Sequence, residues 1–203
     1  MNYFVTGTEG LLRGLFVQQL MSRQHYLYVL VRESSRDRFA ALRARIPSLA
    51  SLRIIPVYGD ITAPNMGLSA NDLELLKGNV DQFFHFTTVY DIDLDEPTQV
   101  KLNIVGTTNA IRVAQTIQAA CFHHVSPLAG KQLFRETYSD DMVNETDEVA
   151  PPYFRSDQES EQVVRLHCNI PYRIHRPTVV PGVPRTTDID GIHGIYDPAK
   201  TIH

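Results

Sequence analysis

Residues 3–10, Tyr-Phe-Val-Thr-Gly-Thr-Glu-Gly, run from an apolar segment into a turn that contains two glycines. Apolar residues with helical spacing follow directly over residues 11–23. A short apolar strand that leads into an amphipathic helix is the repeating unit of proteins built on a parallel sheet. We therefore expect the chain to begin with a β-strand and a helix that packs on it.

The same alternation continues through most of the chain. Further strands are expected at residues 26–31, 52–58, 82–86, 122–125 and 172–175, and helices at 34–45, 70–77, 96–118 and 153–167. Ser34 or Ser35 is the expected N-cap of the first of these helices, and Ser69 that of the second. The order predicts an α/β fold with helices on both faces of a parallel sheet. Proline and glycine dominate beyond Pro177, so we expect one domain over 1–177 and a loop-rich tail over 178–203.

A chain of 203 residues with 43% hydrophobic and 21% charged residues has the composition of one soluble globular domain. Its net charge of -4 gives no reason to expect nucleic acid or an anionic membrane as a partner. No run approaches the ~20 apolar residues that cross a bilayer, and the chain opens with a strand rather than a signal peptide. A cytoplasmic location is therefore expected. Cys121 and Cys168 lack the spacing of a metal motif, so we expect free thiols and no metal.

Seven short motifs occur in an order that is typical of one protein family. They are residues 3–10, Val29-Leu30-Val31-Arg32, Gly59-Asp60-Ile61-Thr62, Phe84-His85-Phe86-Thr87-Thr88, Asn103-Ile104-Val105-Gly106-Thr107, His124-Val125-Ser126 and Arg176-Pro177. Together they resemble the extended short-chain dehydrogenase/reductases, most nearly the group with NAD-dependent epimerase/dehydratases, thioester reductase domains and fatty acyl-CoA reductases. The resemblance implies a Rossmann-type, doubly wound parallel sheet of six or seven strands. Family members continue into a substrate-binding domain that is largely missing here, so we expect an open pocket or one covered by another chain.

In this family a Gly-x-x-Gly-x-x-Gly turn binds the pyrophosphate of a nicotinamide dinucleotide at a helix N-terminus. Gly7 and Gly10 fit the first two glycines, but Arg13 stands at the third. We expect the Arg13 side chain to crowd the helix against the sheet, although it could instead bond a phosphate. Glu9 adds a carboxylate that would repel a bound pyrophosphate.

The adenosine side of the implied site is better preserved than the groove. Arg32 stands where the family binds the 2'-phosphate of NADP, with a solvated arginine cluster as the alternative interpretation. Asp60 and Ile61 match the pair that contacts adenine. Thr87 and Thr88 replace two alanines that line the groove, and they either narrow it or bond to the ligand. The four departures from the family pattern, at Glu9, Arg13, Thr87 and Thr88, lie on one surface and indicate relaxed selection for dinucleotide binding. We therefore expect no cofactor, and NADP rather than NAD if one binds.

The family arranges Asn, Ser, Tyr and Lys around a substrate carbonyl. Asn103 and Tyr153 fit this set, whereas Pro127 stands for the serine and Asp157 for the lysine. Ser126 comes one residue too early and is expected to point to the opposite side of the extended segment. A free phenol ionises near pH ~10, and a carboxylate one helical turn away raises its pKa further. We therefore expect a degenerate active site, a pseudoenzyme with respect to hydride transfer.

Three hypotheses for function remain. The first is a cofactor-independent catalyst of proton transfer, elimination, isomerisation or cyclisation on a small molecule. Asp157 shares a helix face with Tyr153, Tyr90 and Asp91 are expected near the mouth of the site, and a desolvated carboxylate can act as general base. Solvated carboxylates are the plainer interpretation. The second hypothesis is a non-catalytic scaffold or binding partner, and the third is a residual NADP-dependent reductase or epimerase.

Apolar positions on two helices leave a homodimer open. One set comprises Ala110, Val113, Ala114 and Ile117, and the other Val163, Val164 and Leu166. Each set could instead pack against the sheet. We expect a dimer, partly because an open pocket leaves apolar surface to cover.

Overall fold

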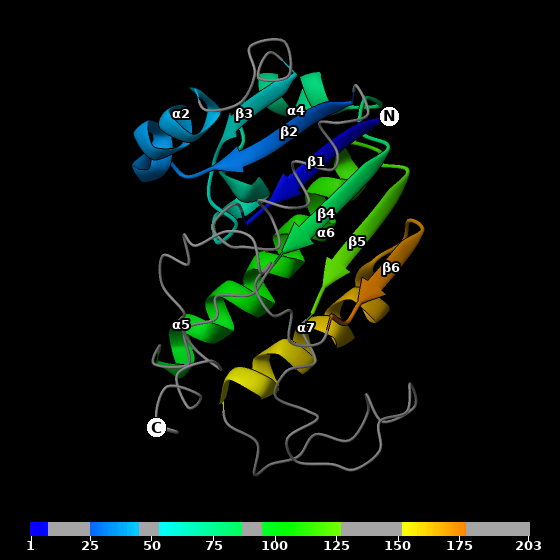
Figure 1. Ribbon diagram of the computed structural model, residues 1–203. Helices are drawn as coiled ribbons and strands as arrows, with labels where there is room; N and C mark the ends of the chain where they lie inside the picture. Colours follow the sequence, from blue (N-terminus) through cyan, green and yellow to red (C-terminus); the bar gives the residue numbers. More distant parts are fainter. Residues whose placement is uncertain (8–24, 45–52, 87–94, 127–151, 178–203) are drawn as a thin grey trace.

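The computed structural model describes residues 1–7, 25–44, 53–86, 95–126 and 152–177, with only the backbone of residues 152–154 and no side chain at 42. These residues form one sheet of six strands: β1 (Asn2–Thr6), β2 (Tyr26–Val31), β3 (Ile54–Tyr58), β4 (Gln82–Phe86), β5 (Cys121–Val125) and β6 (Tyr172–His175). All pairings are parallel, in the order β3-β2-β1-β4-β5-β6 (Figure 1). The order is that of the Rossmann fold, so the fold prediction is confirmed.

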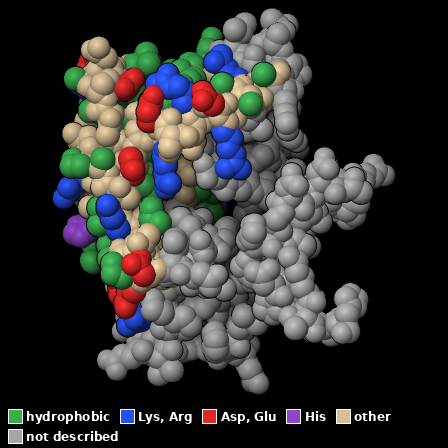
Figure 2. All heavy atoms as spheres, turned by 90° about the vertical axis from the view of Figure 1, so that its left-hand side faces the viewer, with side chains coloured by type: hydrophobic (Ala, Val, Ile, Leu, Met, Phe, Trp, Pro, Cys, Tyr) green, Lys and Arg blue, Asp and Glu red, His purple; other side chains and the backbone are tan. Residues whose placement is uncertain are grey.

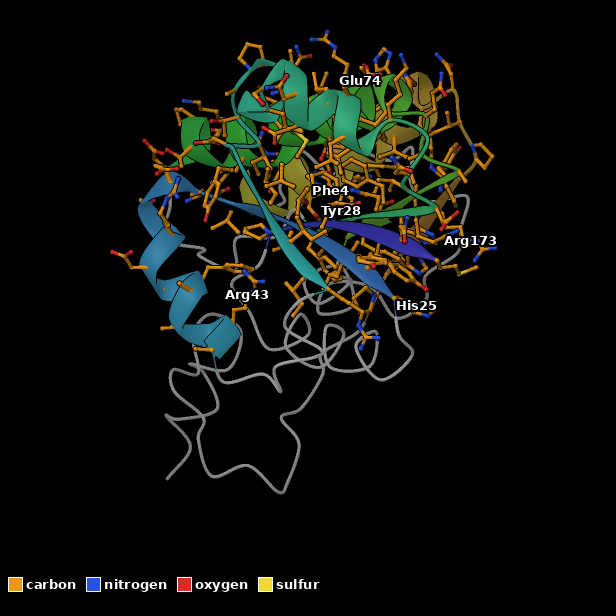
Figure 3. All side chains as sticks on the ribbon, turned by 90° about the horizontal axis from the view of Figure 1, so that it is seen from above. Phe4, His25, Tyr28, Arg43, Glu74 and Arg173 are labelled. Carbon is orange, nitrogen blue, oxygen red and sulfur yellow. The ribbon has the colours of Figure 1, made fainter. Side chains whose placement is uncertain are left out.

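Helices connect the strands of this sheet. They are α2 (Arg36–Ala44), α4 (Ala70–Leu76), α5 (Glu96–Val100), α6 (Gly106–Thr116) and α7 (Pro152–His167), with 3-10 turns at Glu33–Ser35 and Pro64–Gly67. Helices α4, α6 and α7 cover one face of the sheet, and α2 lies beyond the β2–β3 end (Figure 3). A π-helical turn, Lys101–Val105, joins α5 to α6 within what the sequence predicts as one continuous helix.

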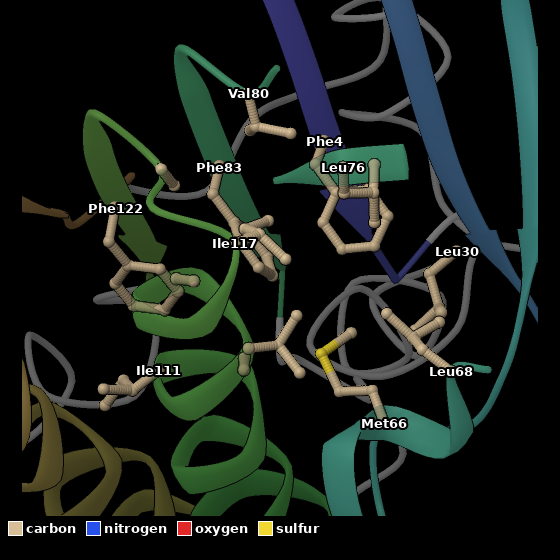
Figure 4. Packing of buried hydrophobic residues seen from close by; sticks show 14 of the residues in the cluster. Phe4, Leu30, Met66, Leu68, Leu76, Val80, Phe83, Ile111, Ile117 and Phe122 are labelled. Carbon is tan, nitrogen blue, oxygen red and sulfur yellow. The ribbon is translucent and has the colours of Figure 1, made fainter. Parts of the chain in front are cut away.

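The main hydrophobic core lies between the sheet and helices α4, α6 and α7 (Figure 4). Phe83 forms edge contacts with Phe4 at 4.8 Å and with Phe122 at 5.3 Å between ring centroids. The α6 face expected either as core or as a dimer interface, which includes Ala110 and Ile117, is completely buried in this layer. That face is therefore core and is not available to a second copy of the chain, whereas Leu166 on α7 is exposed.

A smaller core covers the opposite face of the sheet. Val5, Leu27, Val29 and Val31 are buried there, and Phe39 of α2 packs against them. Burial on both faces explains why β1 and β2 consist of nearly continuous apolar residues instead of alternating ones.

One of the predicted helix N-caps is confirmed. Ser69 caps α4 in a reciprocal capping box with Asp72, as the sequence indicates. Ser34 and Ser35, the alternatives predicted for the N-cap of α2, lie in the 3-10 turn directly before it. Asp95 caps α5 by accepting a hydrogen bond from the Thr98 amide.

The outer surface carries charges of both signs. Acidic and basic side chains are intermixed over the described part of the face in Figure 2. Within the described ranges, no helix is both long enough and apolar enough to span a bilayer. The same ranges contain no cluster of three side chains suited to hold a metal ion.

Candidate active site

The polar groups of the site gather at the carboxyl ends of β1, β4 and β5, where helices α6 and α7 pass. In an open parallel sheet, ligands bind outside these strand ends at the point where the strand order reverses. Here the order reverses between β1 and β4, and Thr6 pairs with His85 in the register at that point. Gly7 follows immediately with φ +71, and a Cβ on it would lie 2.1 Å from the Phe86 carbonyl oxygen. Only glycine fits this turn.

Asn103 lies in the π-helical turn that precedes α6. Its side chain is 2% exposed, and its Nδ2 donates to Ser156 Oγ of α7 at 2.9 Å. Its Oδ1 is buried and accepts no hydrogen bond within the described part of the chain. π-Turns are frequent at functional sites, and an unfilled buried acceptor requires a donor from a ligand or a water.

Asp157 of α7 stands where the family resemblance requires a lysine. It is 1% exposed, and its Oδ2 accepts a hydrogen bond from Ser126 Oγ at 2.9 Å. The buried carboxyl group is therefore bound by a hydroxyl that follows β5. The position contributes a hydrogen-bond acceptor to the site and no cation.

The expected orientation of Ser126 is wrong. Side chains alternate along a strand, so His124 and Ser126 share the face toward α7 while Val125 points away. His124 Nε2 lies 3.1 Å from Ser160 Oγ, and the Ser160 hydroxyl donates to the Asp157 carbonyl at 2.6 Å. Strand β5 and the residue directly after it thus contact α7 through His124 and Ser126, and Ser126 belongs to the site.

A buried ion pair joins α7 to the end of β6. Glu161 of α7 is fully buried, and Arg176, directly after β6, approaches its Oε2 to 2.7 Å through Nη2. Arg176 Nε lies within 3.1 Å and 3.2 Å of the two carboxylate oxygens, so the contact is bidentate. Arg176-Pro177 carries part of the family resemblance, and this contact gives the arginine a physical role.

His85 is completely buried beneath the turn at Gly7. Its Nδ1 lies 2.6 Å from Thr6 Oγ1 and its Nε2 3.3 Å from Thr107 Oγ1 of α6. Burial, and secondarily His124, hold the pKa of His85 well below its ordinary value of 6.5. His85 is therefore neutral at physiological pH, and it joins β1, β4 and α6.

The adenosine side of the implied site is a hollow at the ends of β2 and β3. Its volume is about 440 Å³, and it is lined by Arg32, Glu33, Ser34, Tyr58, Gly59, Asp60 and Gly67. Asp60 Oδ1 accepts from the amide and the hydroxyl of Thr62 at 2.8 and 2.9 Å. Burial alone would raise the pKa of Asp60, but these bonds, Arg32 and Lys101 bring it below its ordinary value. The hollow therefore holds a carboxylate beside the Arg32 guanidinium.

Ile61 turns away from this hollow. Its side chain is 8% exposed and packs in the main core, where a Cβ on Gly106 would meet its Cδ1 at 3.0 Å. Asn109 Nδ2 donates to the Ile61 carbonyl at 2.9 Å. Ile61 thus seats α6 on the sheet, while Asp60 faces the hollow.

Several predicted site residues lie outside the described residues. These are Gly10, Arg13, Thr87, Thr88, Tyr90, Asp91 and Pro127. For Tyr153 the backbone lies in the first turn of α7. The structure therefore brings together Asn103, Asp157 and Ser126 on one side of the strand ends, and Gly7, Arg32 and Asp60 on the other.

The profile of the family described as male sterility protein, an NAD-binding family, matches residues 5–202. The chain belongs to this family. One of the proteins that make up the linear gramicidin synthase of Brevibacillus parabrevis is 30% identical over 132 residues, which are 61% of this chain and 3% of that protein. Fatty acyl-CoA reductase 1 of Mus musculus is 27% identical over 142 residues, 62% of this chain and 27% of that protein.

Solved structures support the family fold. The terminal R domain from the myxalamid PKS-NRPS biosynthetic pathway superimposes with a TM-score of 0.77 at 24% identity. The match covers 91% of this chain and 50% of that domain. The chain thus spans about half of a solved reductase domain and a smaller part of the curated relatives. The chain is a member of the reductases that resemble extended short-chain dehydrogenase/reductases. It corresponds to the Rossmann-fold part of a reductase domain.

The family implies a nicotinamide dinucleotide, and the two halves of its site fit it unequally. On the adenosine side, the turn at Gly7 keeps the glycine that the family requires, and Arg32 and Asp60 would hold the adenosine end. On the nicotinamide side, the lysine that would hold the ribose is a buried aspartate. The described residues fit the first half of the group and not the second.

Three contacts of the site were missed in the sequence. Ser160, Glu161 and Thr107 are buried partners of His124, Arg176 and His85. A signal for two of them was present, because Asp157, Ser160 and Glu161 share one helix face at spacings of three and four. Polar residues at such positions indicate a buried polar contact when the helix covers a sheet.

Proposed function

We propose that this chain is a non-reducing member of the reductase family that catalyses proton transfer on a small molecule without a nicotinamide cofactor. The observation that carries the proposal is the buried Asp157 carboxylate and its 2.9 Å hydrogen bond from Ser126. In the family that the motifs resemble, this position holds the cation that assists hydride transfer. A carboxylate cannot replace that cation, because it disfavours the anionic form of a neighbouring phenol.

The groups that remain suit acid–base chemistry. A buried carboxylate can act as a proton acceptor, and the Asn103 Oδ1 can accept a hydrogen bond from a ligand. Reactions that need only these elements are proton transfer, elimination, isomerisation and cyclisation. Tyr90 and Asp91 are further candidates by their place after β4, and Tyr153 by its place one turn before Asp157.

The test is a comparison of reduction with cofactor-free turnover. The purified protein is assayed with NADPH and NADH against a panel of acyl thioesters and aldehydes, and by proton exchange on carbonyl compounds in D2O. We expect no reduction above background and exchange that is lost in Asp157→Asn. Glu159→Gln on the same helix is the control and leaves exchange unchanged. Reduction of a carbonyl compound at an ordinary enzymatic rate would refute the proposal.

A specific observation favours retained NADP binding as a second candidate. The hollow of about 440 Å³ beside Arg32 and Asp60 is of the size of small-molecule sites. A residual NADP-dependent reductase or epimerase would use it. The measurement is a thermal shift with NADPH and with NADH on wild type, Arg32→Ala and the surface control Arg112→Ala. A shift with NADPH alone, lost only in Arg32→Ala, supports this candidate.

The scaffold hypothesis is supported by the inward contacts of the site. Asn103 and Asp157 both bond within the protein, to Ser156 and Ser126. If Tyr153→Phe and Asp157→Asn both leave the cellular phenotype of a complemented deletion unchanged, the α7 site has no catalytic use and the scaffold hypothesis stands.

A further inference from the structure

Two histidines on neighbouring strands form a hydrogen-bonded pair that the proposed function does not use. His123 of β5 and His175 of β6 bring Nδ1 and Nε2 to 2.8 Å, with ring centroids 5.1 Å apart and planes 16° from parallel. Both point to the face of the sheet opposite α7, because His124 and Arg176, the next residues, contact that helix. The pair is thus separate from the candidate active site.

The protons of this pair follow from its partners. His123 Nε2 lies 2.6 Å from Gln82 Oε1, and this oxygen can only accept. His123 therefore carries its proton on Nε2, and its Nδ1 must accept from His175 Nε2–H. Phe84 stacks on His123 at 4.1 Å and 11°, so the ring is fixed in this orientation.

Such a pair accommodates one additional proton and not two. His175 is exposed, and a proton added to its Nδ1 leaves the Nε2–H bond to His123 in place. When His175 is protonated on both nitrogens, a second proton, on His123 Nδ1, removes the acceptor and sets two N–H groups against each other at 2.8 Å. The contact between the rings therefore exists only while at least one of the two facing nitrogens, His123 Nδ1 or His175 Nε2, carries no proton.

The charges around the pair oppose protonation. Arg173 of β6 pairs in register with His123 and extends outward from the edge of the sheet (Figure 3). Burial, then His175 and Arg173, lower the pKa of His123 to about 4. Burial and Arg173 also lower the pKa of His175. Tyr3, near Phe84, and His25, near Tyr3, are the other titratable groups in the described row of rings on this face.

The position of β6 gives the pair a consequence for the site. β6 is the last strand of the described sheet, and Arg176 directly after it holds the buried Glu161 of α7. We propose that the His123–His175 pair is an acid-sensitive latch that holds β6 on β5 and, through Arg176, holds α7 in place. Acidification opens the latch locally, before the rest of the sheet unfolds.

The direction of the pH effect follows from linkage. Both imidazoles have lower pKa values in the folded strand than the ordinary 6.5, so the open form binds more protons. The closed form is fully favoured above pH 6.5, and it is lost as the pH falls from there toward about 4. Because each pKa unit changes an equilibrium tenfold, we expect local opening to increase roughly tenfold or more over this range.

Hydrogen exchange tests the latch in the whole chain. Protection factors of the β6 amides are measured from pH 7 to pH 5 and divided by those of β2 in the same sample. For the wild type we expect this ratio to fall at least about fivefold. His175→Gln retains a donor to His123 but does not titrate, and His123→Phe retains the stacking on Phe84; both are expected to flatten the ratio. His167→Gln on the exposed end of α7 is the control and behaves like wild type.

A wild-type ratio that does not change with pH, or an equal decrease in wild type and His123→Phe, overturns the latch. If either variant does not fold, NMR titration of the wild-type imidazoles decides instead. His123 remaining neutral at pH 5.5 supports the latch, and an ordinary titration of His123 at 6.5 contradicts it.

Discussion

Glu161 of α7 and Arg176 after β6 form an ion pair in which the Glu161 side chain is fully buried and the Arg176 side chain is 11% exposed. The pair joins the helix that carries Asp157 to the edge of the sheet. A buried ion pair of this kind adds only modestly to the stability of the folded protein. Removing one partner is costly, because the other charge is then buried without a counter-charge or water.

We therefore predict that Arg176→Met destabilises the protein by about 3–5 kcal/mol. The double variant Arg176→Met with Glu161→Leu should recover most of that loss, because it removes both charges and retains their volume. Urea unfolding of the two variants and wild type measures the difference. If the double variant is as unstable as the single one, the cost arises from packing and the ion-pair account is wrong.

A second prediction concerns the ancestral chemistry of the site. Pro127→Ser together with Asp157→Lys restores the two catalytic residue types that the family resemblance requires. We expect this variant to show no NADPH-dependent reduction above wild type, because Arg13, Thr87 and Thr88 remain on the cofactor path. NADPH consumption with a long-chain aldehyde is the measurement. Strong turnover would show that only these two side chains prevented hydride transfer.

Most of the fold could be predicted from periodicity. β2, β4 and β6 have the predicted bounds, and the other described strands differ by one or two residues. The π-turn at Asn103 could not be predicted, since nothing local distinguishes it from an α-turn, and tertiary contact with α7 selects it. The two serines predicted as alternatives for the N-cap of α2 lie in a 3-10 turn directly before it, which the sequence did not predict.

The candidate site is less predictable than the fold. Asp157 is recognisable in the sequence as a charge reversal, but its partner Ser126 is assigned to the wrong side when Pro127 is taken as the residue that faces the site. The pairing of Glu161 with Arg176 and that of His123 with His175 join residues from separate elements. A sequence does not reveal which of its many polar residues meet across a sheet, so these contacts required the structure.

A third prediction compares two glycines with the same backbone. Gly7 and Gly78 have φ values of +71 and +69, but a Cβ on Gly7 would lie 2.1 Å from the Phe86 oxygen while one on Gly78 meets nothing within 4 Å. Gly78→Ala should cost about 1–2 kcal/mol from backbone strain alone. Gly7→Ala should cost a further ~1–3 kcal/mol from overpacking against β4. Chemical unfolding of both variants measures the gap, and equal losses would contradict the close approach at Gly7.

The last prediction is the pH dependence of global stability that His85 introduces. Its folded pKa is far below the ordinary 6.5 because of burial and His124, so unfolding takes up a proton when the pH is below that value. The contribution of neutral His85 to the free energy of unfolding is fully present above pH 6.5. It decreases as the pH falls, by at most about 1.4 kcal/mol per pH unit for this one site. His85→Gln can still bond Thr6 and Thr107 but does not titrate, so it should reduce this slope between pH 6.5 and 5. Urea unfolding at several pH values, with His167→Gln as the exposed control, gives the slopes. An unchanged slope in His85→Gln would mean that His85 is protonated in the folded protein and that its contacts with the two threonines are not those described.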